Sequence, residues 1–241
     1  MKFADKTWSI MKIIENIHIK IEETEVLRYF GYPHKKEDKV SEIILEITKK
    51  AIVLGYCLFE SKGIYSKVMI KNINSEGRIN FKNGLHLEIN NSMLNLLKGT
   101  SCLVFGISTI GNSLEDKVAE LFAENEYPQA IALDAVGIVA TKFASNYIQG
   151  LVYQEAKEQK IYTTKYFSPG SGNWNINQQE NIFQIIQADK IGIQLNDSYM
   201  MIPKKSLSWV IGIEKKTTIK HRGNNSCDSC LAKNCQFRRS I

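Results

Sequence analysis

The 241-residue sequence has few of the features that mark membrane or exported proteins. It contains no long uncharged apolar run, which predicts that no segment spans a membrane. Its first residues carry charges at Lys2, Asp5 and Lys6, where an export signal would place an apolar block. We therefore expect a cytoplasmic protein that makes no contact with a membrane.

Excess positive charge is absent from most of the chain. The net charge is +6, but from Glu214 onward seven basic residues stand against two acidic ones. The remainder holds 24 basic and 23 acidic residues and is nearly neutral. A neutral body with a short basic tail argues against a broad surface for nucleic acid.

Cysteine is scarce until the end of the chain. Cys57 and Cys102 stand singly in apolar surroundings, and we expect both to be buried as small hydrophobic residues. The other three cysteines cluster after residue 226 in a chain without an export layout. This distribution does not suggest a disulfide framework.

The terminal segment Cys227-Asp-Ser-Cys230-Leu-Ala-Lys-Asn-Cys235 predicts a metal site rather than a redox pair or incidental thiols. Two of its thiols are close enough to chelate one ion. His221 could complete a Cys₃His zinc site. An iron–sulfur cluster is the alternative, and it would need a fourth ligand from Cys102 or from a partner.

Hydrophobic periodicity predicts an α+β chain. Alternating isoleucines at 17–21 predict a strand, and helical spacing over 37–54 predicts an amphipathic helix that ends at Gly55. Ser92 is expected to cap a short helix over 93–97. The apolar run 102–107 predicts a central strand.

A long helix rich in small residues is predicted from Pro128 to shortly before Ile161. Gly137 inside it costs roughly 1 kcal/mol relative to alanine, which indicates close packing against another element. Asp134 is the one charge in its mostly apolar first part. Two interpretations stay open: a solvent-facing or locally paired aspartate, or a carboxylate that accepts hydrogen bonds from a ligand.

The segment Lys165-Tyr-Phe-Ser-Pro-Gly-Ser-Gly-Asn-Trp174 joins a strand-like run to a helix-like run. Pro169 fixes one φ angle, while Gly170 and Gly172 permit positive φ and close approach to the backbone. On composition alone this is a tight strand-to-helix connection. A rigid loop with bare backbone groups is also suited to holding a small polar ligand.

Four segments together resemble the activation domain of cobalamin-dependent methionine synthase. They are 25–32, 133–137, 167–174 and 201–212, and the first resembles more closely the stand-alone activation-domain-like proteins of anaerobic bacteria. The resemblance implies a twisted, mainly antiparallel sheet with a long helix and flanking helices. We expect an N-terminal α/β extension at 1–90, an activation-domain-like core at 91–213, and the basic cysteine-rich tail at 214–241.

The resemblance also implies a function. In that family the proline-glycine loop lies against S-adenosylmethionine, and a cobalamin held by another protein or domain is reactivated by reductive methylation of cob(II)alamin. The expected partner is a cobalamin-binding protein or corrinoid methyltransferase, with an electron donor, in methionine biosynthesis. The cofactor-binding positions implied here are Asp134, Tyr166, Ser168, Pro169, Gly170, Ser171 and Gly172. No catalytic residue is predicted.

Two positions depart from the family pattern. Where the family has an arginine that would pair with the ligand's carboxylate, this chain has Tyr166, and where it has a tyrosine, this chain has Ser171. Lys165 could supply charge, but lysine lacks the bidentate fork of arginine. The alternatives are therefore a docking module that has lost its ligand and an electron-transfer partner with a metal-binding tail.

Overall fold

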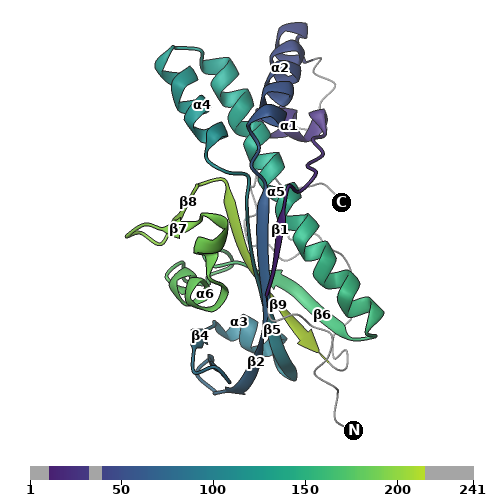
Figure 1. Cartoon of the computed structure of the whole chain (residues 1–241), viewed down its shortest axis with the longest axis vertical. Coiled ribbons are helices and arrows are strands. Elements are labelled where there is room, and N and C mark those ends of the chain that lie inside the picture. Colours follow the sequence, from purple (N-terminus) through teal and green to yellow (C-terminus); the bar gives the residue numbers. More distant parts are fainter. Residues whose placement is uncertain (1–10, 33–39, 215–241) are drawn as a thin grey trace.

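The computed structural model describes residues 11–32 and 40–214, which form one mainly antiparallel sheet covered by helices (Figure 1). Its central path has the order β4-β3-β2-β5-β9-β6, and β1 pairs with β2. The strands are β1 (Met11–Glu15), β2 (Lys62–Ile73), β3 (Arg78–Phe81), β4 (His86–Glu88), β5 (Thr100–Thr109), β6 (Tyr162–Phe167) and β9 (Ser206–Glu214). The short strands β7 (Gln194–Leu195) and β8 (Met201–Ile202) pair separately.

Six α-helices flank these strands in the described part of the chain. They are α1 (Glu23–Tyr29), α2 (Glu42–Leu58), α3 (Asn91–Leu96), α4 (Ser113–Ala123), α5 (Tyr127–Glu158) and α6 (Gln178–Ile186). A 3₁₀ turn, Ala188–Ile191, follows α6.

The sheet separates two hydrophobic cores. Val104 and Trp209 face the first core together with α5, whereas Phe105 and Val210 face the second core together with α6. Successive residues of a strand point to opposite faces, so β5 and β9 are apolar on both. The predicted central strand at 102–107 is confirmed as part of β5.

The long helix α5 confirms the prediction made from its small residues. By length and composition it could cross a membrane, but 61% of its apolar window is buried inside the protein, as in a core helix. A methyl group on Gly137 would lie 2.7 Å from Leu114 Cδ2 of α4. Gly137 therefore permits the close packing that the sequence indicated.

The helices α1, α2 and α4 pack around the first part of α5 and form a helical lobe above the sheet (Figure 1). The predicted end of a helix at Gly55 is wrong, because α2 continues to Leu58. A methyl group on Gly55 would lie 2.6 Å from Val136 Cγ1. This glycine marks the close approach of α2 to α5 instead of a helix end.

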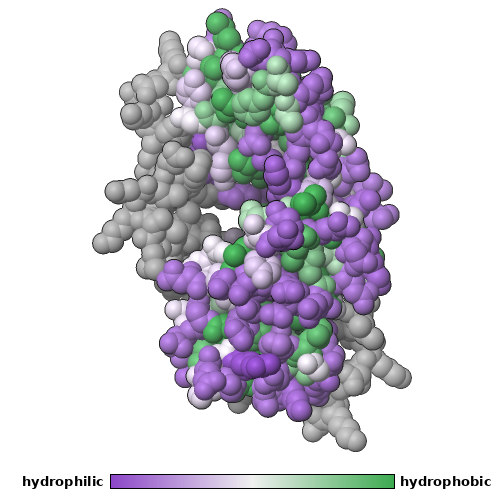
Figure 2. All heavy atoms as spheres, turned by 90° about the vertical axis from the view of Figure 1, so that its left-hand side faces the viewer, coloured by the Kyte–Doolittle hydropathy of each residue, from purple (hydrophilic) through white to green (hydrophobic). Residues whose placement is uncertain are grey.

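Figure 2 shows the side of the molecule that carries α4, the β7–β8 hairpin and α6. Hydrophobic residues gather toward its upper end, whereas hydrophilic residues cover most of the lower end. Exposed hydrophobic residues include Phe122 of α4 and Tyr127 and Ile131 of α5 in the lobe, and Met200 and Ile202 in the hairpin. Exposed hydrophobic area on this side is therefore concentrated above α6.

Three further sequence predictions are wrong. Residues 17–21 form no strand; Ile17 and Ile19 are buried, but they extend past β1 without a ladder partner. The cap of α3 is Asn90, whose Oδ1 accepts a hydrogen bond from Met93 N at 3.0 Å, and not Ser92. Cys57 is exposed on α2, whereas Cys102 is buried as expected.

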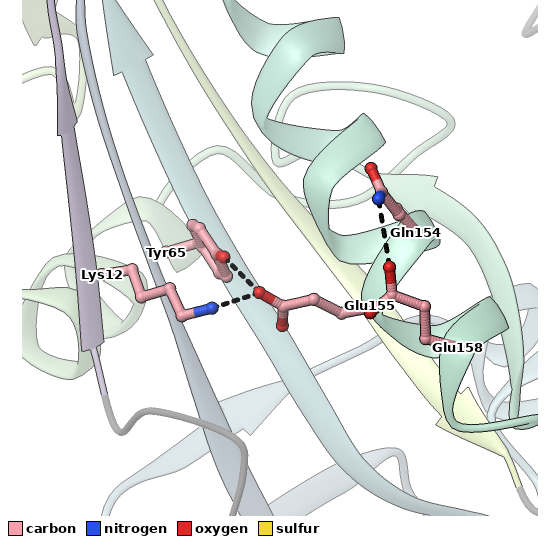
Figure 3. A network of polar contacts seen from close by, with 5 residues as sticks. All are labelled: Lys12, Tyr65, Gln154, Glu155 and Glu158. Atoms are coloured by element: carbon pink, nitrogen blue, oxygen red, sulfur yellow. Dashed lines mark hydrogen bonds and ion pairs between the residues drawn. The ribbon is translucent and has the colours of Figure 1, made fainter.

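A polar cluster joins β1, β2 and α5 (Figure 3). Glu155 of α5 accepts a hydrogen bond from the Tyr65 hydroxyl at 2.8 Å and forms an ion pair with Lys12. Lys12 Nζ also lies 5.7 Å from the centre of the Tyr65 ring. The cluster fastens the edge strand β1 and the neighbouring β2 to the last turns of the long helix.

Candidate functional site

The predicted ligand loop begins where β6 leaves the sheet. β6 is an edge strand whose last residue, Phe167, pairs with Val210 of β9. Ser168 is half-buried and Pro169 is buried, whereas residues 170–173 are exposed. Pro169 anchors the loop against the protein, and the glycine-containing part faces solvent.

The loop is closed by its own backbone hydrogen bonds. Ser171 N donates to Ser168 O at 3.1 Å, Trp174 N to Ser171 O at 3.1 Å, and Gly170 N to Trp174 O at 2.8 Å. The φ angle of Gly170 is +81°, and a methyl group there would lie 3.1 Å from Ile176 Cδ1. A glycine is therefore favoured at 170 by backbone conformation and by space.

Three hydrogen bonds hold the loop and the start of α6 to the end of β4. Asn90 Nδ2 donates to Gly172 O at 3.1 Å, and Trp174 Nε1 donates to Glu88 O at 2.7 Å. Glu88 N donates to Gln178 Oε1 at 2.9 Å. The indole of Trp174 is buried in the second core, so it acts as a packing residue.

Several polar groups of the loop have no hydrogen-bond partner among the described residues. Among the described residues, no hydrogen bond satisfies the N–H groups of Gly172 and Asn173 or the hydroxyls of Ser168 and Ser171. Residues 171–173 are exposed, so solvent or a ligand reaches their groups. The loop thus exposes hydrogen-bond donors on a backbone that is fixed by its hydrogen bonds to the end of β4.

Asp134 has a partner away from this loop. Its Oδ1 lies 2.6 Å from Lys205 Nζ, and the side chains of Asp134 and Lys205 are 42% and 16% exposed, respectively. Lys205 precedes β9, and its N–H donates to Glu115 of α4. Within the described chain, no hydrogen bond or ion pair joins Asp134 to residues 168–172, and a contact of Asp134 with a ligand stays a prediction.

Tyr166 lies on the face of β6 that is turned toward α5. Its register partner, Ile211, belongs to the core shared with α5. Burial raises the pKa of Tyr153 of α5 to about 12, and Tyr166 contributes to this rise. Tyr166 itself is 36% exposed. It presents a phenol where the family pattern has a guanidinium.

The sequence pointed to the loop but missed the residues that hold it. Asn90 and Glu88 are more than eighty residues earlier in the chain than the groups they contact, and no local pattern connects them with 172–178. The only local signal was the turn composition near 90, which we assigned to a cap at Ser92. The supporting side chain was therefore visible only after β4 and the loop had been placed together.

The metal prediction concerns residues that lie outside the described ranges. Cys227, Cys230, Cys235 and His221 all fall after residue 214. Within residues 11–32 and 40–214 no group of three or more His, Cys, Asp or Glu side chains could hold a metal ion. The terminal metal site stays a prediction.

Comparison with known proteins identifies the fold. No protein-family model matches the chain, and no curated protein sequence matches it significantly. The chain is similar to the solved structure of the MetH reactivation domain bound to AdoHcy, with a TM-score of 0.60 and 11% sequence identity. The match covers 87% of this chain and 80% of that chain. This likeness confirms the predicted α+β fold of the activation domain, with its mainly antiparallel sheet and long helix.

Proposed function

We propose that this protein binds S-adenosylmethionine at the 168–172 loop and supports the reactivation of a cobalamin-dependent methyltransferase. The observation that carries the proposal is an exposed loop, with donors that no described residue satisfies, on the fold of a domain solved with AdoHcy. AdoHcy, S-adenosylhomocysteine, is the product that remains when S-adenosylmethionine gives up its methyl group. A cytoplasmic location is part of the same proposal.

Methyl transfer to a cobalamin requires that the two reactants be positioned relative to each other. A partner protein would hold the cobalamin, and an electron donor would supply the electron that cob(II)alamin needs before it accepts a methyl group. The carbon–sulfur bond of the sulfonium would break with the bonding electrons left on sulfur, and the reduced cobalamin of the partner would supply the electron pair for the new bond to the methyl carbon. Because no proton moves in this transfer, the chain needs no acid–base pair; it has to bind and orient the ligand.

Isothermal titration of the full chain with S-adenosylmethionine and S-adenosylhomocysteine tests the proposal. We expect micromolar binding that Gly170→Val abolishes, because valine strains the +81° φ angle and crowds Ile176. Gly99→Val is the matched control: its φ is +86°, and nothing lies within 4 Å of the added Cβ. It should cost similar stability and leave binding unchanged.

The second candidate is a docking module without a ligand. It is favoured by Tyr166 and Ser171, which remove two side chains of the family pattern. No heat and no thermal shift from the wild-type chain at millimolar ligand would contradict ligand binding and leave this candidate.

The terminal cysteines belong to a separate proposal. Cys227, Cys230 and Cys235, with His221 or a partner's group, would bind zinc or an iron–sulfur cluster. Zinc would suit a folded docking tail, whereas a cluster would suit electron delivery. Anaerobic purification followed by metal analysis distinguishes them, and near-stoichiometric amounts of neither metal would contradict both.

A further inference from the structure

Two neighbouring N–H groups of the loop have no acceptor among the described residues. The carbonyl oxygens of Gly172 and Trp174 accept hydrogen bonds from Asn90 Nδ2 and Gly170 N, at 3.1 and 2.8 Å. The N–H groups of Gly172 and Asn173 donate to no described residue. The exposed surface at 172–173 is therefore suited to a ligand that accepts hydrogen bonds.

The geometry of the peptide group links Asn90 to one of these donors. The carbonyl of Gly172 and the N–H of Asn173 belong to one planar trans peptide and point in opposite directions. Since the carbonyl points to Asn90, the N–H of Asn173 points away from the β4 end that holds the loop. Asn90 thereby sets the direction in which this donor is presented.

The Asn90 side chain is itself held in one orientation. Its Oδ1 accepts the hydrogen bond from Met93 N at the start of α3, at 3.0 Å. Only the oxygen of an amide can accept from an N–H group, so the nitrogen is left for the Gly172 carbonyl. The same short segment holds Trp174 and Gln178 through Glu88, which fixes the chain that follows the peptide.

We propose that the N–H groups of Gly172 and Asn173 bind the carboxylate of the ligand's amino-acid part, with Asn90 as their positioning residue. The inference rests on the proposed function and deepens it. A carboxylate is a strong acceptor, and its hydrogen bonds with backbone N–H groups are charge-assisted.

The test compares S-adenosylmethionine with its decarboxylated form, which keeps the adenosine, the sulfonium and the amino group. Wild-type protein should bind S-adenosylmethionine more tightly. Asn90→Ser keeps an acceptor for Met93 N but is too short to reach Gly172 O. We expect it to weaken S-adenosylmethionine binding about fivefold, which corresponds to about 1 kcal/mol, and to leave binding of the decarboxylated ligand unchanged.

Two further variants distinguish the loss of the contact with the loop from the loss of the helix cap. Asn90→Asp keeps the cap and places a carboxylate against the Gly172 carbonyl, so it should weaken binding at least as much while the melting temperature holds. Asn90→Ala should weaken binding and also lower the melting temperature, because the cap is lost. Asn80→Ser is the control: it removes an exposed hydrogen bond of 2.8 Å to Asn72 on β2 and should leave binding unchanged.

The outcomes distinguish this inference from the proposed function. If the wild-type chain binds neither ligand, the proposed function fails and this inference fails with it. If it binds both ligands equally, ligand binding stands and the carboxylate site is overturned. If Asn90→Ser weakens the binding of both ligands by the same factor, Asn90 supports the loop in general and does not position the donors for the carboxylate.

Discussion

At the scale of single residues, the tyrosine in the β1–β2–α5 cluster (Figure 3) has a consequence for alkaline stability. Burial raises the pKa of Tyr65 to about 12, and its hydrogen bond to Glu155 adds to the rise. An unfolded tyrosine loses its proton near a pH of about 10, so above that pH the folded state binds more protons than the unfolded state. The contribution of the protonated Tyr65 to the free energy of unfolding is complete below a pH of about 10. It is lost as the pH rises toward the folded-state pKa of about 12.

We predict that the free energy of unfolding falls more steeply between about pH 10 and 11 in the wild type than in Tyr65→Phe. The difference should be about 1 kcal/mol, since one pKa unit corresponds to about 1.36 kcal/mol. Near pH 8 the variant should be less stable by about 1.5 kcal/mol, because the hydrogen bond to a charged acceptor is lost. Urea denaturation monitored by circular dichroism measures both effects.

Tyr162→Phe is the control for this experiment, because Tyr162 is exposed at the start of β6. It should reproduce the wild-type pH profile. Parallel profiles for wild type and Tyr65→Phe would show that the pKa of Tyr65 does not differ between the folded and unfolded states as its surroundings indicate.

At the scale of elements, two glycines of α5 have opposite roles. A Cβ at Gly137 would lie 2.7 Å from Leu114 Cδ2 and 3.0 Å from Lys205 Cε, the side chain that pairs with Asp134. Gly150 is exposed, and a Cβ there meets nothing within 4 Å. At Gly150, helix propensity therefore decides how an added methyl group changes stability. At Gly137, the close packing against α4 and against Lys205 before β9 decides it.

We predict that Gly150→Ala stabilises the protein by about 0.5–1 kcal/mol, the usual gain in a helix interior. Gly137→Ala should instead destabilise it by about 1–3 kcal/mol, because Leu114 is fully buried and cannot move without disturbing the core. Chemical denaturation of both variants measures the pair. Equal stabilisation by both substitutions would mean that α4 yields readily to the added methyl group.

The segment 17–21 shows why a local hydrophobic pattern was not sufficient to predict a strand. The alternation at 17–21 was a true signal of alternating burial, since Ile17 and Ile19 are buried. It was not a signal of a continuous ladder: one backbone hydrogen bond joins Ile17 N to Ser61 O, and the other bonds use the hydroxyls of Ser61 and Tyr56. Period-two burial requires an extended chain, but a strand also requires a neighbour, which the sequence does not display.

At the scale of the whole molecule, the sheet crosses the predicted boundary near residue 90. β2 belongs to the expected extension and β5 to the expected core, yet they pair in register from Lys62↔Thr109 to Met69↔Cys102. A sheet that shares its central hydrogen bonds is expected to unfold as one unit. The division into 1–90, 91–213 and 214–241 remains a prediction about the role of each part.

We therefore predict a single cooperative transition when the full chain is unfolded by urea, with coincident curves from tryptophan fluorescence and far-ultraviolet circular dichroism. The chain has three tryptophans, and Trp8→Phe leaves only Trp174 and Trp209, so its fluorescence reports on the part after residue 90, whereas circular dichroism reports on the whole backbone. Two separated transitions would show that 1–90 folds independently of the core.

Local signals in the sequence were enough for three features: the apolar central strand, the long small-residue helix, and the proline-glycine loop after β6. The three-dimensional arrangement was needed to find which residues support that loop and which partner Asp134 has. Asn90 is 82 residues from Gly172, and Lys205 is 71 residues from Asp134. Hydrogen bonds and ion pairs of this kind depend on how distant segments meet in the sheet, because the interactions act over a few ångströms in space and leave no periodic pattern along the chain.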